Sequence, residues 1–414
     1  MTSSIDEQLV SHELFADQPR ARALFAQLRR DDPLHYTTAE GYPPFWAVTK
    51  HADILEVERQ QDRFINAPLV FMRSTEELRE RERTGNPLRV LLGMDGADHR
   101  AHRALVQAWF MPQNLKNLEL MVSQRATEMV DKLLERGPEC DFARDIGQWY
   151  PLKVIMSLMG VPDEDHPHLL RLTQQLLAPR DPDMKRTVGG SNIAAIKEVV
   201  GDFFAYFTKV VADRRINPRD DISTLLANAQ VHGQPIGQME LMSLFLNLAT
   251  AGHDTTASSL AGGLQALLEN PLEFEKLRAQ PELLPSAVEE IFRWTTPVKH
   301  FCRTATEDYV LRGKQVRKGD ILMLFYPSGN LDEEVFPDGE QFRVDRTPNR
   351  HIAFGSGAHV CLGMHLSRME LKMFFKEFLR KVGRIEMIGK PEQVLSNEVA
   401  GPKHLHVRYE AALA

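Results

Sequence analysis

A long apolar stretch near the middle of the chain sets the strongest limit on its fold. Residues 238–269 keep a helical pattern over about thirty positions, whereas a helix in a globular protein averages about 11–12. Between Leu244 and Ala249 the stretch is apolar on every side, which is typical of a helix buried all round. We therefore expect a mainly α protein in which this helix runs through the centre of the molecule.

Within this stretch, Ala251–Thr256 reads A-G-H-D-T-T and interrupts the apolar pattern. A mid-helix glycine and buried polar groups cost stability unless they have a function. Threonine hydroxyls also bond back to carbonyls of the preceding turn and bend a helix. A plain kink with satisfied hydroxyls is the simpler interpretation. The other is that the glycine, the carboxylate and the two hydroxyls serve a function.

The segment Phe354–Gly363, F-G-S-G-A-H-V-C-L-G, leads into a second helical pattern that stops before Gly383. Cys361 thus lies at or just before a helix N-terminus, where free N–H groups and the helix dipole favour a thiolate. Three glycines permit positive φ angles or the close approach of a flat ligand, and these are Gly355, Gly357 and Gly363. The whole pattern indicates a cysteine that is held ionised and faces a ligand.

Cys361 on its own has a simpler explanation, because a lone cysteine before a helix is usually buried packing. The glycines do not complete a G-x-G-x-x-G dinucleotide fingerprint, since Val360 stands where its last glycine belongs. No second cysteine nearby makes a C-x-x-C redox or zinc site. The complete pattern of Phe354–Gly363 is far more specific than any of its parts.

The composition limits the class of protein. A hydrophobic content of 43% with 26% charged residues is ordinary for a soluble globular chain. The net charge of −7 without a basic tract argues against nucleic-acid binding. We see no signal peptide or membrane span, and three widely separated cysteines fit a reducing cytoplasm. No repeat or long linker divides the chain, so we expect one domain over residues 1–414.

The rest of the chain predicts helices with a few short strands. Residues 66–94 are charged and loop-rich, and we expect them to be mobile, with a short solvated helix at 73–83. The other expected elements are a helix at 21–30, strands at 34–36 and 45–48, a helix from His51, helices over 114–211 broken near Pro151 and Pro162, a polar loop at 178–190, and strands over 309–325 with turns at Gly313 and Gly319.

Two pairs of charged residues share helix faces. His99 and Arg103, four residues apart on a helix that starts near Asp95, are placed to bind an anion, although solvated faces commonly carry such pairs. His102 is one position off that face and is expected at the surface. Glu290 and Arg293 are spaced i to i+3, and a surface pair of this kind would contribute little.

The loop F-G-x-G-x-H-x-C-x-G, the A-G-H-D-T-T motif and the E-x-x-R at residues 290–293 together resemble the cytochrome P450 family, over essentially the whole chain. The resemblance implies the family's fold, an α-rich triangular prism with small β-sheets. Haem b would lie between the long central helix and the helix after the cysteine loop. In the family the cysteine is the axial iron ligand, which assigns Cys361 that role. It also implies a monooxygenase that puts one atom of dioxygen into a C–H bond and releases the other as water.

The resemblance assigns further residues. Asp254 and Thr255 would relay protons so that the O–O bond breaks heterolytically. Glu290 and Arg293 would be a buried structural pair with a third partner, Arg343 or Arg346. Expected haem contacts are His99, Arg103, Ala251, Arg303, Phe354, Gly355, His359 and Gly363, with His351 as a further propionate ligand and Cys302 as packing. The 178–190 loop would form a lid over the substrate channel.

The substrate is expected to be a small apolar molecule. The expected pocket consists of Asn247, Leu248, Ala251, Thr255, Val298, Phe301 and Val399. Stretches such as R-W-T-T-P-V-K-H-F resemble the bacterial terpineol-hydroxylating branch of the family, which favours a terpenoid. A steroid or an aromatic hydrocarbon is the alternative.

The chain ends about fifty residues after Cys361 without a reductase domain, so the resemblance implies an iron–sulfur ferredoxin and an NAD(P)H-dependent ferredoxin reductase as partners. Exposed basic residues such as Arg100 and Arg350 would attract the acidic ferredoxin to the cysteine side. We expect a monomer. A peroxide-driven peroxygenase and a non-catalytic haem sensor are the alternatives, and neither needs both Asp254 and Thr255.

Overall fold

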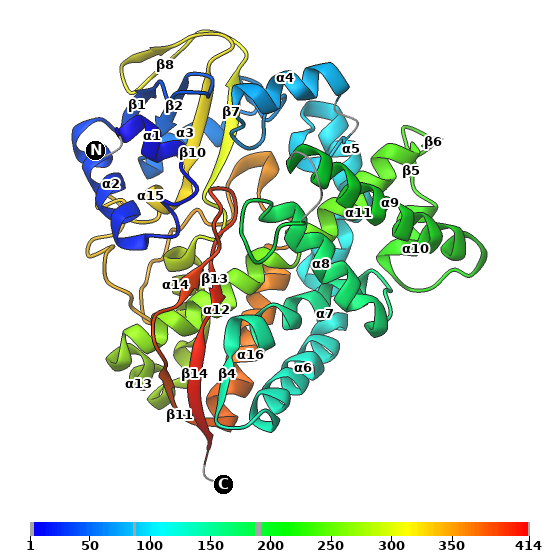
Figure 1. Cartoon of the computed structure of the whole chain (residues 1–414), viewed down its shortest axis with the longest axis vertical. Coiled ribbons are helices and arrows are strands. Elements are labelled where there is room, and N and C mark those ends of the chain that lie inside the picture. The colour runs from blue at the N-terminus through cyan, green and yellow to red at the C-terminus, as the bar shows by residue number, and fades with distance from the viewer. Residues whose placement is uncertain (1–3, 86–87, 187–191, 413–414) are drawn as a thin grey trace.

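We describe the protein from a computed structural model, which places residues 4–85, 88–186 and 192–412. Helices make up most of the molecule (Figure 1), as the apolar periodicity predicts. In chain order they are α1 (Ile5–Val10), α2 (Gln18–Asp31), α3 (His51–Arg59), α4 (Thr75–Thr84), α5 (Gly96–Gln107), α6 (Pro112–Glu135), α7 (Trp149–Leu158), α8 (His166–Leu177), α9 (Asn192–Ile216), α10 (Ile222–Ala227), α11 (Gln238–Ala251), α12 (Asp254–Glu269), α13 (Pro271–Ala279), α14 (Leu284–Thr295), α15 (Tyr326–Gly329) and α16 (Met364–Lys381). Within the described ranges, none of these helices is long and apolar enough to span a membrane.

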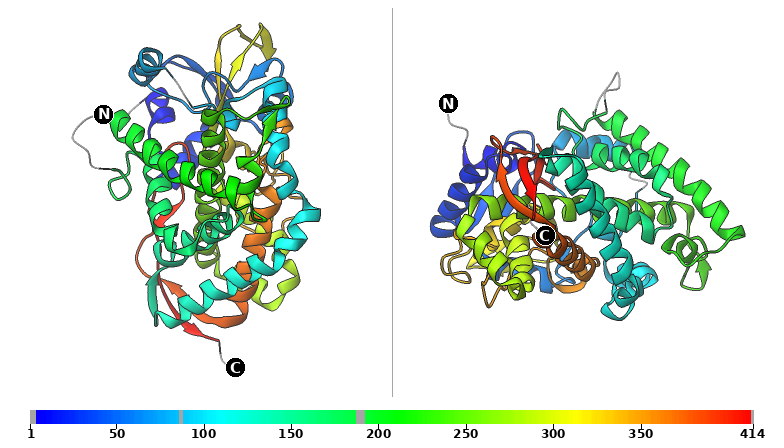
Figure 2. Two further views of the ribbon diagram at one scale, coloured as in Figure 1. Left: turned by 90° about the vertical axis from the view of Figure 1, so that its right-hand side faces the viewer. Right: turned by 90° about the horizontal axis from the view of Figure 1, so that it is seen from below.

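The strands are short and form small sheets. They are β1 (Leu34–Thr37), β2 (Phe45–Val48), β3 (Phe64–Ile65), β4 (Glu139–Asp141), β5 (Gln230–Val231), β6 (Gln234–Pro235), β7 (His300–Ala305), β8 (Tyr309–Leu311), β9 (Lys314–Val316), β10 (Ile321–Phe325), β11 (Val382–Met387), β12 (Glu392–Gln393), β13 (Pro402–His404) and β14 (His406–Ala411). The largest sheet has the order β1-β2-β10-β7-β3, in which only β2 and β10 are parallel. In the view from below in Figure 2, this sheet and the N-terminal helices, in blue and yellow, lie on the opposite side of the molecule from α9 and α10, in green.

Helix α12 runs through the middle of the helical part and contacts α7, α14 and α16. Leu260, Leu264 and Leu267 are fully buried on it. Gly263 lets α14 approach closely, since a Cβ there would stand 2.8 Å from Ile291 Cγ2. Helix α16 packs on α6 and α14 as well as on α12, and this fixes the position of the loop that precedes it.

Most of the predicted elements are confirmed within a few residues. Helices α2 and α3 and strands β1 and β2 lie where the pattern places them, and α16 ends at Lys381, just before Gly383. Strands β8, β9 and β10 are separated by turns at Gly313 and Gly319, where φ is 73° and 91°. Residues 178–186 form turns without a helix, and 187–190 of the predicted loop lie outside the described residues.

The predicted continuous helix over 238–269 is wrong in one respect, because the chain forms two helices there. α11 ends at Ala251 and α12 begins at Asp254, with Gly252 and His253 between them. A Cβ at Gly252 would stand 2.7 Å from the Leu248 carbonyl oxygen, so this position needs glycine. The A-G-H-D-T-T motif therefore breaks the helix instead of only bending it.

Residues 66–85 and 88–94 contribute to the core, contrary to what their charge predicts. Their buried apolar residues are Leu69, Met72, Leu91 and Met94. The main chain is also fixed, since the Asn66 N–H donates to Asp95 Oδ1 (2.9 Å). The exposed charges concentrate on α4, the predicted solvated helix, which has no buried residue. Apolar residues on either side of that helix pack into the core.

The helical region 114–211 is broken at a different place from the one predicted. Pro162 does separate α7 from α8, but Pro151 lies in the first turn of α7. The earlier break comes at β4, where Cys140 pairs with Val407 of β14. The partner strand lies near the far end of the chain, so the local pattern gave no sign of this strand.

Candidate active site

The segment Phe354–Gly363 closes on itself before α16 begins. The Cys361 N–H donates to the Phe354 carbonyl oxygen (2.8 Å). Gly357 has a φ of 70°, and a Cβ there would stand 2.5 Å from the Glu58 carbonyl oxygen. Gly363 differs, because its φ is −85° and no described protein atom lies within 4 Å of a Cβ placed on it. Gly357 therefore lets the loop turn against α3, and Gly363 leaves room on the opposite side.

Cys361 lies on the wall of an internal cavity. Burial raises the pKa of its thiol, although the Gly363 N–H and then Arg103 and Arg368 act to lower it. The helix terminus and the nearby cations thus act in the direction that the sequence predicts, against the effect of burial. A cation bound to the sulfur would favour the thiolate further.

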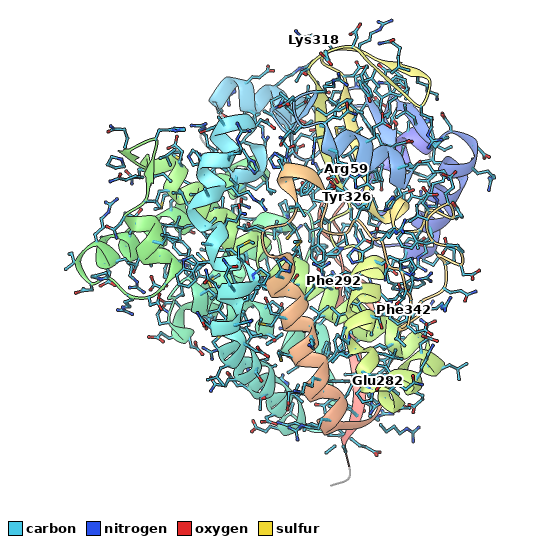
Figure 3. The ribbon with its side chains drawn as sticks, turned by 180° about the vertical axis from the view of Figure 1, so that it is seen from behind. Arg59, Glu282, Phe292, Lys318, Tyr326 and Phe342 are labelled. Carbon is cyan, nitrogen blue, oxygen red and sulfur yellow. The ribbon has the colours of Figure 1, made fainter. Side chains whose placement is uncertain are left out.

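The cavity contains about 1440 Å³ of empty space, its opening to solvent included. Figure 3 labels Phe292 and Tyr326, two of its wall residues, beside the N-terminal end of α16. Most of the residues predicted for the site line it, and these are His99, Arg103, Asn247, Leu248, Ala251, Thr255, Val298, Phe301, Arg303, Phe354, Gly355, His359, Cys361 and Gly363. Segments from four parts of the chain thus meet around one space.

One residue predicted for the substrate pocket and one predicted as a propionate ligand are not on the cavity wall. Val399 pairs with Val298 in an isolated β-bridge, which keeps it behind the residue that faces the cavity. His351 Nε2 instead lies 3.0 Å from Glu289 Oε2. Burial would raise the pKa of Glu289, but His351 and Arg368 lower it to about 2. His351 is therefore held by a carboxylate outside the cavity.

Arginine and histidine side chains from three segments converge on the cavity. The rings of His99 and His359 stack with their centroids 4.0 Å apart, and Arg103 Nη2 donates to the Val360 carbonyl oxygen (2.9 Å). Burial, and then the charges of His99, Arg303 and Arg103, lower the pKa of His359 to about 3. The buried Nε2 of His99 has no hydrogen-bond partner among the described residues. An anion bound here would give His99 a partner and offset the repulsion between the cations.

His102, predicted at the surface, is buried. Its Nδ1 lies 2.9 Å from the Asp98 carbonyl oxygen within α5. The prediction failed because α10 packs against α5 and covers it. The local sequence gives no indication of the contact between α10 and α5.

Arg303 reaches the cavity together with two residues that the sequence did not predict. Its Nη2 lies 3.4 Å from Glu58 Oε1, which also accepts a hydrogen bond from the Tyr326 hydroxyl (2.6 Å). Burial raises the pKa of Glu58, although Arg303 and Tyr326 act to lower it. Glu58 ends an ordinary amphipathic helix and Tyr326 follows a buried strand, so no pattern distinguishes them.

The break between α11 and α12 brings a hydroxyl to the cavity wall. The Thr255 hydroxyl donates to the Ala251 carbonyl oxygen (3.0 Å), the back-bond that the motif predicts. Asp254 lies beside Thr255 but is not on the wall. Its Oδ2 is buried without a hydrogen-bond partner among the described residues. A proton acceptor and a hydroxyl therefore adjoin at the break.

Glu290 and Arg293 form a fully buried ion pair. Both Arg293 Nε and Nη2 donate to the carboxylate of Glu290, each at 2.7 Å. Arg346 Nε adds a third contact at 3.1 Å to Glu290 Oε2, whereas Arg343 contributes only its main-chain N–H (2.9 Å). Arg293 Nη1 also donates to the carbonyl oxygen of Asn330 (2.9 Å). The pair thus ties α14 to the segment that leads to the cysteine loop.

These residues fit a haem group. A cysteine sulfur on the cavity wall is a suitable axial ligand, and thiolate is a known ligand of haem iron. The unpartnered His99 nitrogen and the surrounding cations suit the two propionates of a porphyrin. The open space beside Gly363 lets a flat ring lie close to the main chain.

Comparison with known proteins agrees with this assignment. Residues 72–383 match the family model described as Cytochrome P450. The chain is 38% identical over 408 residues to cytochrome P450-terp from a Pseudomonas species, covering 96% of this chain and 95% of the relative. It is 34% identical over 397 residues to a steroid C26-monooxygenase of Mycolicibacterium smegmatis, covering 94% and 90%. It is 31% identical over 395 residues to linalool 8-monooxygenase of Pseudomonas putida, covering 93% and 94%.

The fold is shared with solved structures. The crystal structure of CYP108D1 from Novosphingobium aromaticivorans superposes with a TM-score of 0.90 and 36% sequence identity, over 99% of this chain and 98% of that chain. Members of the family use haem b and dioxygen, and the relatives named above include monooxygenases. The sequence match over most of the chain and the shared fold lead to one conclusion: the chain belongs to the cytochrome P450 family, and it is a monooxygenase of that family.

Proposed function

We propose that the chain is one haem domain that hydroxylates a compact apolar molecule, with a terpenoid as the favoured class. It would use dioxygen and two electrons from a ferredoxin and its NAD(P)H-dependent reductase. The observation that carries this proposal is that the Cys361 sulfur and the Thr255 hydroxyl line the same largely apolar cavity. A haem sensor would need the cysteine alone, whereas a hydroxyl next to a carboxylate serves proton transfer.

The roles of the haem contacts follow from their positions. Cys361 would bind the iron, and the propionates would lie among His99, Arg103, Arg303 and His359. Phe354, Gly355, Gly363 and Ala251 would lie against the ring. When bound, the haem supplies an iron centre whose thiolate ligand favours cleavage of the O–O bond. The protein holds the group, limits the access of water, and brings protons through Asp254 and Thr255.

A terpenoid is supported by the shape and chemistry of the cavity and by two relatives. Leu248, Val298 and Phe301 offer apolar contacts, and the Asn247 amide and the Thr255 hydroxyl are polar points for an alcohol or carbonyl. The similarity to cytochrome P450-terp and to linalool 8-monooxygenase favours the same class. A steroid or an aromatic hydrocarbon is the second candidate, and the similarity to a steroid C26-monooxygenase supports the steroid.

A titration of the purified ferric protein distinguishes these classes. A substrate that displaces water from the iron changes its spin state and moves the Soret band to shorter wavelength. We expect a saturable shift with monoterpene alcohols and none with steroids or aromatic hydrocarbons. A saturable shift with steroids alone would remove the terpenoid proposal and leave the haem enzyme intact.

Thr255→Ala should uncouple electron use from product formation. Without the hydroxyl, protons reach the cavity less efficiently, and we expect about tenfold or more loss of product per NAD(P)H, with hydrogen peroxide accounting for the difference. Thr250→Ala is the matched control, because Thr250 makes the same back-bond to Leu246 (2.8 Å) but does not line the cavity. Fully coupled turnover in Thr255→Ala would exclude the relay.

Electron delivery is proposed at the face next to the cysteine loop. Arg100 and Arg350 are exposed and would attract an acidic ferredoxin, despite the net charge of −7. The adjoining Asp254 and Thr255 disfavour a peroxide-driven peroxygenase, which has no need of proton delivery to dioxygen. We further propose a cytoplasmic monomer that binds neither nucleic acid nor membranes.

A further inference from the structure

His253 lies in the break between α11 and α12 and is fully buried. Its Nε2 is 3.0 Å from the carbonyl oxygen of Gln148. On the other side of the ring, Nδ1 is 3.3 Å from Asp254 Oδ1 and 3.5 Å from the hydroxyl oxygen of Thr173 on α8. Asp254 is the one carboxylate within 4.0 Å of this ring in the described ranges.

The partners of the ring decide where its protons are. A carbonyl oxygen only accepts, so Nε2 must carry a hydrogen to bond Gln148. The Thr173 hydroxyl donates its one hydrogen to the Leu170 carbonyl oxygen (3.0 Å), which leaves its oxygen as an acceptor for Nδ1. An ionised Asp254 is also an acceptor only. If the ring were neutral with its hydrogen on Nε2, the Nδ1 lone pair would face the Thr173 hydroxyl oxygen and Asp254 Oδ1, and both contacts would be repulsive.

We propose that His253 is doubly protonated and acts as a positioning residue for Asp254. Its Nδ1–H holds Oδ1 of Asp254, while the Gln148 carbonyl anchors the opposite end of the ring. Oδ2 is then left without a hydrogen-bond partner in the described part of the chain, next to Thr255. This oxygen would take a proton from water and pass it on toward Thr255, returning to carboxylate, while His253 keeps both of its protons throughout. The inference rests on the proposed oxygenase function.

The protonation of His253 is measurable without turnover. We would record ¹⁵N spectra of the histidine rings in the diamagnetic ferrous–carbon monoxide protein at neutral pH, with His253→Gln to assign the signal. We expect both nitrogens of His253 to be protonated in the wild type and one to lose its proton in Asp254→Asn. A neutral ring with a bare Nδ1 in the wild type would overturn the proposal, because Asp254 would then supply the shared proton.

His166 is a matched internal control for the spectra. It is also buried, and its Nε2 lies 3.3 Å from the Val161 carbonyl oxygen, but its Nδ1 has no hydrogen-bond partner among the described residues. Burial lowers the pKa of His166, and its ring should therefore appear neutral in the same spectrum. A cationic His166 would show that the ¹⁵N signals do not follow the hydrogen-bond partners of the ring nitrogens. The conclusion that His253 is doubly protonated would then also be rejected.

Turnover gives a second test. His253→Gln should reduce product per NAD(P)H by about threefold to tenfold at unchanged KM, whereas His166→Gln should leave both values unchanged. Unaltered coupling in His253→Gln would remove the positioning role even if the ring is cationic. If His253→Gln fails to retain haem, the signal that changes in Asp254→Asn identifies His253, and the wild-type spectrum still decides its protonation. The spectra need no substrate, which keeps this inference separate from the proposed function.

Discussion

Glu290→Ala should lower the free energy of unfolding by about 3–5 kcal/mol and yield protein that retains little haem. The substitution leaves Arg293 charged and fully buried, with only carbonyl oxygens as partners. It also removes the acceptor of Arg346 and of the Arg343 main-chain N–H. Six hydrogen bonds to one carboxylate, including one from Asn349 Nδ2 (3.0 Å), therefore fail together. Denaturant unfolding, followed by circular dichroism and by Soret absorbance, measures the loss.

Glu377→Ala is the matched control for this prediction. Glu377 and Arg380 are also spaced i to i+3 and bond at 2.7 Å, but Arg380 is exposed at the surface of α16. Screening and side-chain entropy limit such a pair, so its loss should cost less than about 1 kcal/mol. Equal, small losses for both variants would show that the Glu290 pair contributes no more than a surface pair and would contradict its structural role.

Cys361→Ser should abolish hydroxylation, by about three orders of magnitude or more, while the protein still folds. Cys361 provides the one sulfur among the described residues of the cavity wall. A serine hydroxyl is a far weaker donor to iron and does not favour O–O cleavage in the same way. The carbon monoxide difference spectrum of the reduced protein should lose the band that is typical of a thiolate ligand.

Cys140→Ser controls for the general effect of removing a thiol. Cys140 is buried in β4, and burial raises the pKa of its thiol to about 12, so it stays an uncharged packing residue. This variant should keep the wild-type carbon monoxide spectrum and activity. If Cys361→Ser also kept them, the iron ligand would be a different residue and the assignment of the site would be wrong.

The parts of the site that lie close together in sequence were predictable. The cysteine loop, the Ala251–Thr256 motif and the Glu290–Arg293 pair each fall within ten residues or fewer, and local spacing places their side chains together. The long apolar stretch likewise predicts a central helix, although the pattern could not show that Gly252 breaks it. Contacts between residues that are close in sequence can therefore be predicted from their spacing.

The contacts between distant segments could not be predicted in this way. Arg346 reaches Glu290 because the chain returns past α14. The sequence spacing alone could not decide between Arg343 and Arg346 as the third partner. The Glu58–Tyr326–Arg303 contact joins three segments that carry no shared pattern. His102 becomes buried only when α10 packs on its helix.

The most direct test of the account is the origin of the oxygen in the product. The purified protein would be supplied with a ferredoxin, its reductase, NAD(P)H and a monoterpene alcohol under ¹⁸O₂, and the product analysed by mass spectrometry. We expect each newly hydroxylated product to carry one ¹⁸O atom and the other atom to appear in water. Product oxygen that comes from water, or product that forms only when peroxide is added, would contradict a dioxygen-dependent monooxygenase.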